Sequence, residues 1–210
     1  MNIAILGVGN VGVALGGSWA RKGHLVVFGV RDPASRDVSA SLARIGGKAR
    51  AASVADAAAA GEIVALAVPW PAVPDALRAA GNLAGKILFD CTNPLLPDLS
   101  GLDVGLTTSA GEKVAALAPG ARVVKIFNTT GSGNMADSAY GSERPTMFYC
   151  GDDPSAKTIA GQLAAEIGFD PIDAGPLRQA RLLEPYALLW ISLAVQRGLG
   201  TGIAFKLMRR

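Results

Sequence analysis

The chain has 210 residues, a formal net charge of +3 and a hydrophobic content of 50%. This length suits one packed α/β domain with a short appendage, and the apolar content excludes a disordered chain. The longest apolar run, residues 186–195, is too short to cross a bilayer, which takes about 20 residues. The sequence lacks the basic runs and interleaved aromatic residues of nucleic-acid-binding proteins, so we expect neither a membrane nor a nucleic acid as partner. The mild positive charge favours a small acidic ligand such as a phosphate-bearing cofactor.

The two cysteines, Cys91 and Cys150, fit neither a C-x-x-C motif nor a disulfide framework. They are expected to be reduced and to behave as small buried hydrophobic residues. The first apolar segment leads directly into a glycine motif at Gly7, which leaves no room for an export signal in front of it. These observations predict a cytoplasmic protein.

Short β-rich runs alternate with Ala-rich helical stretches along the chain. The predicted strands are residues 2–6, 25–30, 63–68, 86–90, 121–127, 146–150 and 169–172. The predicted helices are residues 11–22, 35–45, 54–60, 71–80, 110–117 and 154–167. This alternation is typical of βαβ units and predicts an α/β fold with a mostly parallel sheet. Because the strands are apolar throughout, helices should cover both faces of the sheet.

The motif GVGNVG lies between the first predicted strand and the first predicted helix. In this context Gly7 allows a tight turn, Gly9 lets the backbone approach a pyrophosphate, and Gly12 lets the helix pack closely on the strand. The pyrophosphate would lie on the amides at the positive end of the helix dipole. The alternative is a glycine-rich turn that binds nothing. The candidate cofactor-binding residues of this motif are Gly7, Val8, Gly9, Asn10, Val11 and Gly12.

The segment FGVRDP, residues 28–33, lies where a ribose-reading residue is expected, about 20 positions beyond the glycine motif. Spacing alone does not separate Arg31 from Asp32, although an aspartate would select NAD and an arginine NADP. Asp32 before Pro33 is typical of a helix start, with Asp as the N-cap and Pro at the first helical position. Arg31 is then left to bind a 2′-phosphate, with Arg36 as a candidate second cation. The alternative is that Arg31 is a solvated surface residue.

Three further segments follow the ends of predicted strands, where open α/β sheets bind ligands. They contain the candidate residues Val68, Pro69, Trp70, Asn93, Pro94, Asn128 and Thr129. The asparagines can hydrogen-bond a carboxamide or a ring carbonyl, and the proline and tryptophan can enclose an apolar slot. Asn93 and Pro94 are equally consistent with a plain turn. No catalytic acid or base and no metal ligands are predicted, and the only histidine, His24, is expected to be structural.

The tail of the chain is apolar around most of a helical circumference from residue 186 to residue 195. Such a helix must be buried on several sides, which predicts a homodimer interface, with a core helix of the monomer as the alternative. Pro185 should end or kink this helix unless the long stretch begins there. Glu184 could contact a partner subunit or substrate, or serve as a cap or ion-pair partner. Residues 1–175 are predicted to form the dinucleotide-binding domain and residues 176–210 a helical extension.

Several motifs together point to one family. They are GVGNVG, KGH at 22–24, VPW at 68–70, CGDD at 150–153, DAGPL at 173–177 and ARLLE at 180–184. On these residues the chain resembles the F420-dependent NADP reductases and their relatives, which include the cytoplasmic reductase domain of the STEAP metalloreductases. The family often has a hydroxyl residue second in the glycine motif and a serine before the arginine, both in contact with the 2′-phosphate, where this chain has Val8 and Val30.

The resemblance covers nearly the whole chain and has functional implications. It implies a Rossmann-type, doubly wound domain with a helical C-terminal extension, dimerisation, and hydride transfer between NADP and a deazaflavin (F420) or a flavin such as FMN. Transfer between two bound rings needs mainly proximity and alignment. Two alternatives stay open: an NADP-dependent imine or keto reductase on the same fold, which needs a general acid, and a non-enzymatic dimer that senses the NADPH/NADP ratio.

Overall fold

The computed structural model describes residues 1–46 and 49–210, and in this part of the chain eight strands form one sheet in the order β3-β2-β1-β4-β5-β6-β7-β8. The strands are β1 (Asn2–Leu6), β2 (Leu25–Val30), β3 (Ala49–Ser53), β4 (Ile63–Leu66), β5 (Ile87–Asp90), β6 (Arg122–Lys125), β7 (Thr146–Gly151) and β8 (Asp170–Asp173). Neighbouring strands are parallel except β6 and β7, which are antiparallel. The predicted Rossmann-type sheet is confirmed, since the first five strands have the order 3-2-1-4-5.

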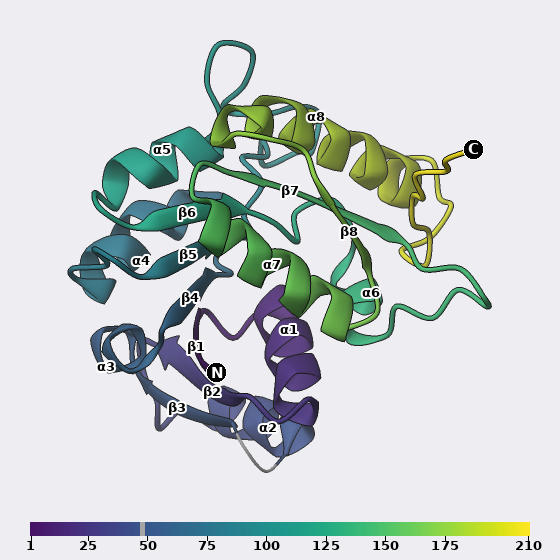
Figure 1. The fold of residues 1–210 in the computed structure, drawn as a ribbon. Helices are drawn as coiled ribbons and strands as arrows, with labels where there is room; N and C mark the ends of the chain where they lie inside the picture. Colours follow the sequence, from purple (N-terminus) through teal and green to yellow (C-terminus); the bar gives the residue numbers. More distant parts are fainter. Residues whose placement is uncertain (47–48) are drawn as a thin grey trace.

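Helices cover both faces of this sheet, as Figure 1 shows. They are α1 (Asn10–Arg21), α2 (Arg36–Ile45), α3 (Val54–Ala60), α4 (Val73–Ala80), α5 (Ala110–Leu117), α6 (Ser132–Ala136), α7 (Pro154–Glu166) and α8 (Ala180–Ile191). Two short 3-10 helices, η1 (Trp70–Ala72) and η2 (Leu177–Gln179), precede α4 and α8, and a π-helical turn, η3 (Ser192–Gln196), follows α8. Helices α1, α2, α6 and α7 pack on one face, and α3, α4 and α5 on the other, with α8 beside α5.

The central strands send alternate side chains to opposite faces of the sheet. In β1, Ile3 and Ile5 enter the core beneath α1 and α7. Ala4 and Leu6 enter the core beneath α3 and α4. All four side chains are fully buried, which accounts for the uninterrupted apolar character of these strands.

Two short elements have no counterpart in the sequence-based prediction. Strand β3 is an edge strand of Ala, Arg and Ser without β-branched residues, and α6 spans only five residues. Packing against β2 and α1 stabilises them. The strands predicted at 63–68 and 121–127 end earlier, at Leu66 and Lys125, because the chain leaves the sheet there to form loops.

Pro185 lies inside α8, five residues after the first helical residue. Its ring removes the backbone hydrogen bond to the carbonyl of Arg181. Glu184 and Ala187 nevertheless face the interior, and this packing keeps the helix continuous to Ile191. The expectation that Pro185 would end the helix, or that the helix begins there, is therefore wrong, whereas a kink at Pro185 stays a prediction.

The sheet ends at Asp173 and α8 follows it on the surface of the same body. The predicted division between residues 1–175 and 176–210 stays a prediction. Within residues 1–46 and 49–210, no helix combines the length and apolar character needed to cross a membrane.

Candidate dinucleotide-binding site

The loops predicted to bind the cofactor leave the same edge of the sheet. The last residue of β1, Leu6, is level with Leu66 of β4, and Asp90 and Lys125 follow at the same level in β5 and β6. Because these strands are parallel, the segments after them open at the edge where doubly wound sheets bind ligands. The predicted residues in these segments are Gly7, Val8, Gly9, Asn10, Val11 and Gly12 after β1, Arg31 and Arg36 after β2, Val68, Pro69 and Trp70 after β4, Asn93 and Pro94 after β5, and Asn128 and Thr129 after β6.

The glycine motif forms the turn between β1 and α1. Gly7 has a φ of +105°, and a Cβ there would lie 2.6 Å from the carbonyl oxygen of Ala67. A Cβ on Gly12 would lie 2.4 Å from the Gly7 carbonyl oxygen, so only glycine lets α1 approach the turn this closely. Gly9 is exposed, an added Cβ would have nothing within 4 Å, and α1 begins directly after it without a side-chain cap. These features fit the approach of a pyrophosphate to the start of α1.

The segment after β2 starts α2 differently from the prediction. The N-cap of α2 is Ser35, whose Oγ accepts a hydrogen bond from the Val38 amide at 3.4 Å. Asp32 Oδ1 instead accepts a hydrogen bond from the Ala34 amide at 3.0 Å and so closes a local turn. The prediction that Asp32 is the N-cap and Pro33 the first helical residue is therefore wrong, because the turn at 32–34 comes before the helix.

The side chains of Arg31 and Arg36 remain exposed at this edge. Among the ion pairs of the described residues, none involves either arginine. One oxygen of Asp32 is engaged in the turn next to Arg31. Both guanidinium groups are therefore available to an anion from solvent, which fits a 2′-phosphate.

Asn93 and Asn128, which follow neighbouring strands, contact each other directly. Asn128 Nδ2 donates to Asn93 Oδ1 at 3.1 Å, and Asn93 Nδ2 donates to the Asn128 carbonyl at 2.8 Å. Asn128 Nδ2 also donates to the carbonyl of Leu183 in α8 at 3.2 Å. Asn93 is half-buried, whereas Asn128 is buried and its Oδ1 has no hydrogen-bond partner among the described residues. Asn93 is thus the accessible member of the pair, and the buried Asn128 fixes the orientation of the Asn93 side chain through these two hydrogen bonds.

The turn after β6 is held by packing. Phe127 has a φ of +63°, a left-handed conformation that costs a non-glycine residue about 1 kcal/mol or more. Its buried ring packs against Trp19 with 5.6 Å between the ring centroids, and this contact stabilises the turn into Asn128. Thr129 is buried, and its hydroxyl lies 3.8 Å from Met147 Sδ. The hydroxyl of Thr129 therefore faces the core, and a role of Thr129 in cofactor binding stays a prediction.

The segment after β4 begins beside the glycine motif. Val68 Cγ1 would lie 3.1 Å from a Cβ on Gly7, and Pro69 next to it is exposed. Trp70 is half-buried, and its Nε1 donates to Asp103 Oδ2 at 2.9 Å. Pro94, in the next loop, is buried. Trp70 is therefore fixed by the loop that follows β5, and its ring can form one wall of the crevice.

A buried charge cluster lies beneath these loops. The sequence-based prediction named only one of its members, Glu184. Lys125 Nζ lies 2.8 Å from Asp90 Oδ2 and 3.0 Å from Glu184 Oε1, and all three side chains are buried. Burial alone would lower the pKa of Lys125, but Asp90 and then Glu184 outweigh it, so this pKa lies above its ordinary value. Of the roles considered for Glu184, the structure shows an ion pair and a cap. The available signal was a charged residue that directly follows buried apolar residues at the end of each of two strands, β5 and β6.

Neither the cysteines nor His24 contributes a reactive group to the crevice. Burial raises the pKa of the Cys150 thiol to about 12, and it also raises that of Cys91. Both thiols are buried and not disulfide-bonded, as expected. His24 lies before β2, at the opposite edge of the sheet, where its Nε2 is 2.7 Å from Glu166 Oε2.

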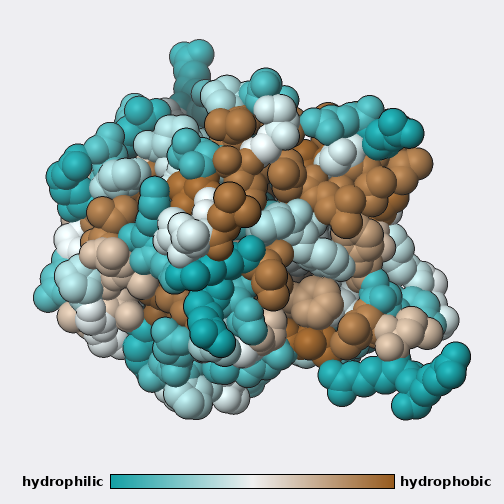
Figure 2. Space-filling view, turned by 90° about the horizontal axis from the view of Figure 1, so that it is seen from above, coloured by the Kyte–Doolittle hydropathy of each residue, from teal (hydrophilic) through white to brown (hydrophobic). Residues whose placement is uncertain are grey.

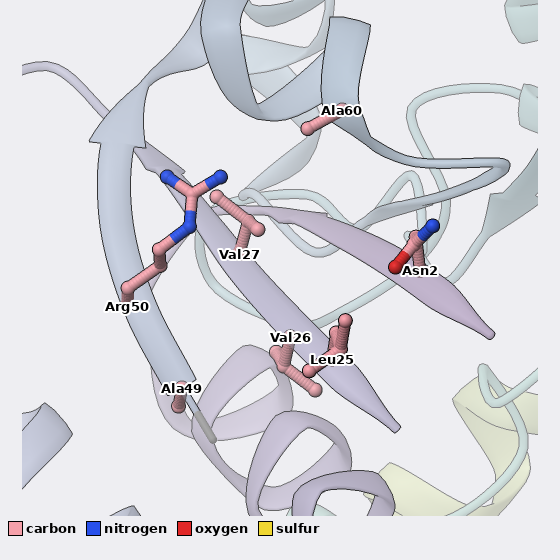
Figure 3. Close-up of a pocket in the computed structure, with 7 residues that line it drawn as sticks. All are labelled: Asn2, Leu25, Val26, Val27, Ala49, Arg50 and Ala60. Atoms are coloured by element: carbon pink, nitrogen blue, oxygen red, sulfur yellow. The ribbon is translucent and has the colours of Figure 1, made fainter. Parts of the chain in front are cut away.

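Two hollows flank the first strands at opposite edges of the sheet. The larger, of about 410 Å³, lies at the amino ends of β1 and β2, away from the glycine motif (Figure 3). It is lined by Asn2, Leu25, Val26, Val27, Ala49, Arg50 and Ala60. The smaller, of about 270 Å³, borders the glycine motif and is lined by Val8, Gly9, Asn10, Val13, Ala14, Arg44, Ser132, Gly133 and Ala136. Only the second hollow adjoins the candidate site.

Comparisons with known proteins agree with this geometry. The model of the family described as "NADP oxidoreductase coenzyme F420-dependent" matches residues 2–94. The metalloreductase STEAP3 of Rattus norvegicus is 30% identical over 187 residues, which are 89% of this chain. The match spans only 36% of the length of that protein.

Solved structures extend the similarity over the whole chain. A crystal structure from Arthrobacter sp. FB24, provisionally described as an F420-dependent NADP-reductase, has a TM-score of 0.90 and 36% sequence identity, and the match covers 100% of both chains. A reductive aminase from Aspergillus terreus, solved with NADPH and ethyl levulinate, has a TM-score of 0.66 and 22% identity, covering 94% of this chain and 62% of that one, which shows a shared fold alone. From the motifs, the fold and the full-length match, the chain belongs to the family of coenzyme F420-dependent NADP oxidoreductases.

Proposed function

We propose that this chain transfers a hydride between NADP(H) and a deazaflavin, coenzyme F420, or a flavin such as FMN. The observation that carries the proposal is the neutral lining of the crevice at the nicotinamide end. Pro69, Trp70 and Asn93, which are proposed to line it, have no titratable side chain, and Asp103 Oδ2 next to them accepts the hydrogen bond of Trp70 Nε1. Such a lining can orient a flat ring but offers no proton to a reduced carbonyl or imine. The full-length similarity to the Arthrobacter protein supports the same assignment.

We propose that NADP(H) binds along the carboxyl edge of β1 and β2. The open position at Gly9 and the uncapped start of α1 would bind the pyrophosphate. Arg31 would make a forked contact with the 2′-phosphate, with Arg36 as a second cation. Val8 and Val30 supply no hydroxyl, so the two arginines would carry most of the selection for NADP over NAD.

The chain would promote transfer by alignment. Bound NADPH supplies a hydride from its nicotinamide ring. The half-buried amide of Asn93 would bind the nicotinamide carboxamide, and Asn128 would hold that amide in orientation. Pro69 and Trp70 would form the apolar wall against which the two rings stack and from which water is excluded.

Anaerobic mixing of the protein with NADPH and F420 tests the proposal, because reduction bleaches the deazaflavin absorbance. Rapid bleaching that depends on the protein is the expected result, with FMN and riboflavin as parallel acceptors. Efficient reduction of small ketones or imines with F420 and flavins untouched would instead indicate an imine or keto reductase. Binding of NADPH without reduction of any acceptor would indicate a dinucleotide sensor.

We also propose that two copies of the chain associate through α8. Leu182 and Leu189 lie two turns apart on this helix and are 66% and 50% exposed. Val195 in η3 and Leu199 continue the exposed apolar surface beyond the helix. Figure 2 shows apolar surface gathered on the face of the molecule that carries α8. An apolar helix face of this kind suits a self-complementary homodimer interface.

A further inference from the structure

Lys125 is fully buried, and its ammonium group has three close oxygen neighbours. Its Nζ lies 2.8 Å from Asp90 Oδ2, 3.0 Å from Glu184 Oε1 and 2.6 Å from the Thr92 carbonyl oxygen. Lys125 donates hydrogen bonds to Asp90 and Thr92, and its contact with Glu184 is an ion pair. Because its side chain is fully buried, Lys125 contacts these neighbours rather than a ligand in the crevice.

The two carboxylates are held by backbone amides as well. Glu184 Oε2 accepts from the Ala110 amide at 2.9 Å and Oε1 from the Gly111 amide at 3.0 Å, at the start of α5. The cluster has two carboxylates and one ammonium, and the positive end of α5 compensates the additional negative charge. Replacing a buried ion cluster with apolar groups often leaves stability unchanged or raises it. A buried ion cluster is therefore weak evidence for a contribution to stability.

The cluster reaches the candidate site through Thr92. Asp90 Oδ1 accepts from the Thr92 amide at 3.0 Å and from its hydroxyl at 2.7 Å, while Lys125 donates to its carbonyl. The amide, hydroxyl and carbonyl of this residue are thus all held by the cluster. Asn93, the accessible asparagine of the crevice, is the next residue in the chain.

Helix α8 therefore holds both members of the asparagine pair. The Leu183 carbonyl accepts from Asn128 Nδ2 at 3.2 Å. Glu184, the following residue, binds Lys125, which binds the Thr92 carbonyl next to Asn93. Leu183 and Glu184, two consecutive residues of α8, are thus linked to the loops that follow β6 and β5.

We propose that Glu184 is a positioning residue, which acts through Lys125 and the Thr92 carbonyl to orient Asn93 toward the nicotinamide ring of the cofactor. This inference rests on the proposed NADP(H) site and goes beyond it, since Glu184 itself touches neither cofactor nor substrate. The Glu184→Gln substitution keeps the shape of the side chain but removes its charge. It should loosen the Thr92–Asn93 turn while leaving the adenosine end of the site intact.

The test separates the two ends of the cofactor. Calorimetric titrations measure the dissociation constants of NADPH and of 2′-phospho-ADP-ribose, which lacks only the nicotinamide. The dissociation constant of 2′-phospho-ADP-ribose divided by that of NADPH gives a ratio that reports the contribution of the nicotinamide ring. We expect Glu184→Gln to lower this ratio about tenfold, the effect of losing roughly one aligned hydrogen bond, with little change in the affinity for 2′-phospho-ADP-ribose.

Glu112→Gln is the matched control. Glu112 also joins α5 to α8, because it accepts hydrogen bonds from Arg181 at 2.6 and 2.8 Å, but among the described residues it has no hydrogen bond or ion pair with Lys125 or Thr92. Its substitution should leave the ratio unchanged. An equal fall in the ratio in Glu112→Gln would overturn the proposal, because helix docking in general would then explain the effect.

A second variant covers the case in which Glu184→Gln fails to fold. Glu184→Asp keeps the charge but withdraws the carboxylate from Lys125, and it should lower the same ratio about threefold, as expected for one weakened contact in the proposed route. An unchanged ratio in whichever variant folds contradicts the positioning role and leaves the proposed function standing. A parent protein whose affinity gains nothing from the nicotinamide ring would overturn the proposed function, and the role of Glu184 with it.

Discussion

The side chains of Asn93 and Asn128 form a mutually bonded pair across the ends of β5 and β6. Each donates one hydrogen bond to the other residue, at 2.8 and 3.1 Å. Asn93 is half-buried at the crevice and Asn128 is buried behind it. The pair therefore has one member in position to bind a ligand and one in position to orient it.

Asn93→Ala should slow hydride transfer from NADPH to F420 at least about tenfold, because the nicotinamide would lose an oriented hydrogen-bonding partner. Stopped-flow measurement of F420 bleaching gives the rate. The Asn82→Ala variant is the control, since Asn82 is exposed in the turn after α4 and bonds only the nearby Ala84 amide. A rate in Asn93→Ala equal to that of the control would remove Asn93 from the nicotinamide site.

Arg31→Ala should abolish most of the preference for NADPH over NADH. A single forked contact from arginine to a 2′-phosphate should favour NADPH by about 1.5–3 kcal/mol, or roughly tenfold to a hundredfold. Calorimetric titration with both cofactors measures the preference. Arg50→Ala is a suitable control, because this exposed arginine lines the hollow at the opposite edge of the sheet (Figure 3). Retention of the full preference in Arg31→Ala would show that another group reads the phosphate.

Leu189→Glu should convert a dimer to a monomer by placing a charge in the proposed α8 interface. Light scattering at micromolar concentration reports the mass of parent and variant. Leu117→Glu, at the end of α5, introduces the same charge at a leucine that is 47% exposed and should leave the dimer intact. A parent protein that is monomeric at this concentration rules out the interface.

Lys125→Met should lower the free energy of unfolding by about 3–5 kcal/mol, since it leaves two buried carboxylates without their counter-ion. Urea denaturation followed by circular dichroism measures the loss. The triple variant Lys125→Met, Asp90→Asn and Glu184→Gln should recover part of it, because no unpaired charge remains. A triple variant less stable than the single one would mean that hydrogen bonds rather than charge dominate the cluster.

The ion pair between Glu112 and Arg181 should make stability depend on pH below about 4.5. Hydrogen bonds from the Arg181 side chain hold the pKa of Glu112 below its ordinary value of 4.5. A lowered pKa means that the contribution is present above the unfolded value and is lost as pH falls through the folded value. Both side chains are partly exposed, so Glu112→Gln should cost only about 0.5–1 kcal/mol at pH 7. Scanning calorimetry should show this difference shrink as the pH is lowered below about 4.5, and a difference that stays constant as the pH falls would contradict the assignment.

The parallel order of the first strands and the glycine turn could be predicted from the sequence, because both depend on local patterns. Apolar runs of strand length between helical stretches predict βαβ units wherever they occur. Gly7 and Gly12 stand at positions where any side chain would meet a carbonyl oxygen within 2.6 Å. Five neighbouring strand ends then bring the predicted loops to one edge without further information.

Local signals were insufficient where two arrangements had similar sequence requirements. Asp32 before Pro33 can start a helix or close a turn, and the structure has the turn because Ser35 caps α2 instead. Pro185 ends many helices, but buried neighbours on both sides keep α8 continuous. In both cases the choice depended on contacts that lie outside the motif.

The buried cluster and the asparagine pair were decided by tertiary structure alone. Lys125 is 35 residues from Asp90 in the sequence, and Asn128 is 55 residues from Leu183. Such partners meet only when strand register and helix packing bring them to one place. The sequence shows a charged residue at the end of an apolar strand, which indicates that a partner is needed. It does not show which partner, because a buried charge or amide is satisfied by whichever complementary group the fold brings within hydrogen-bonding distance.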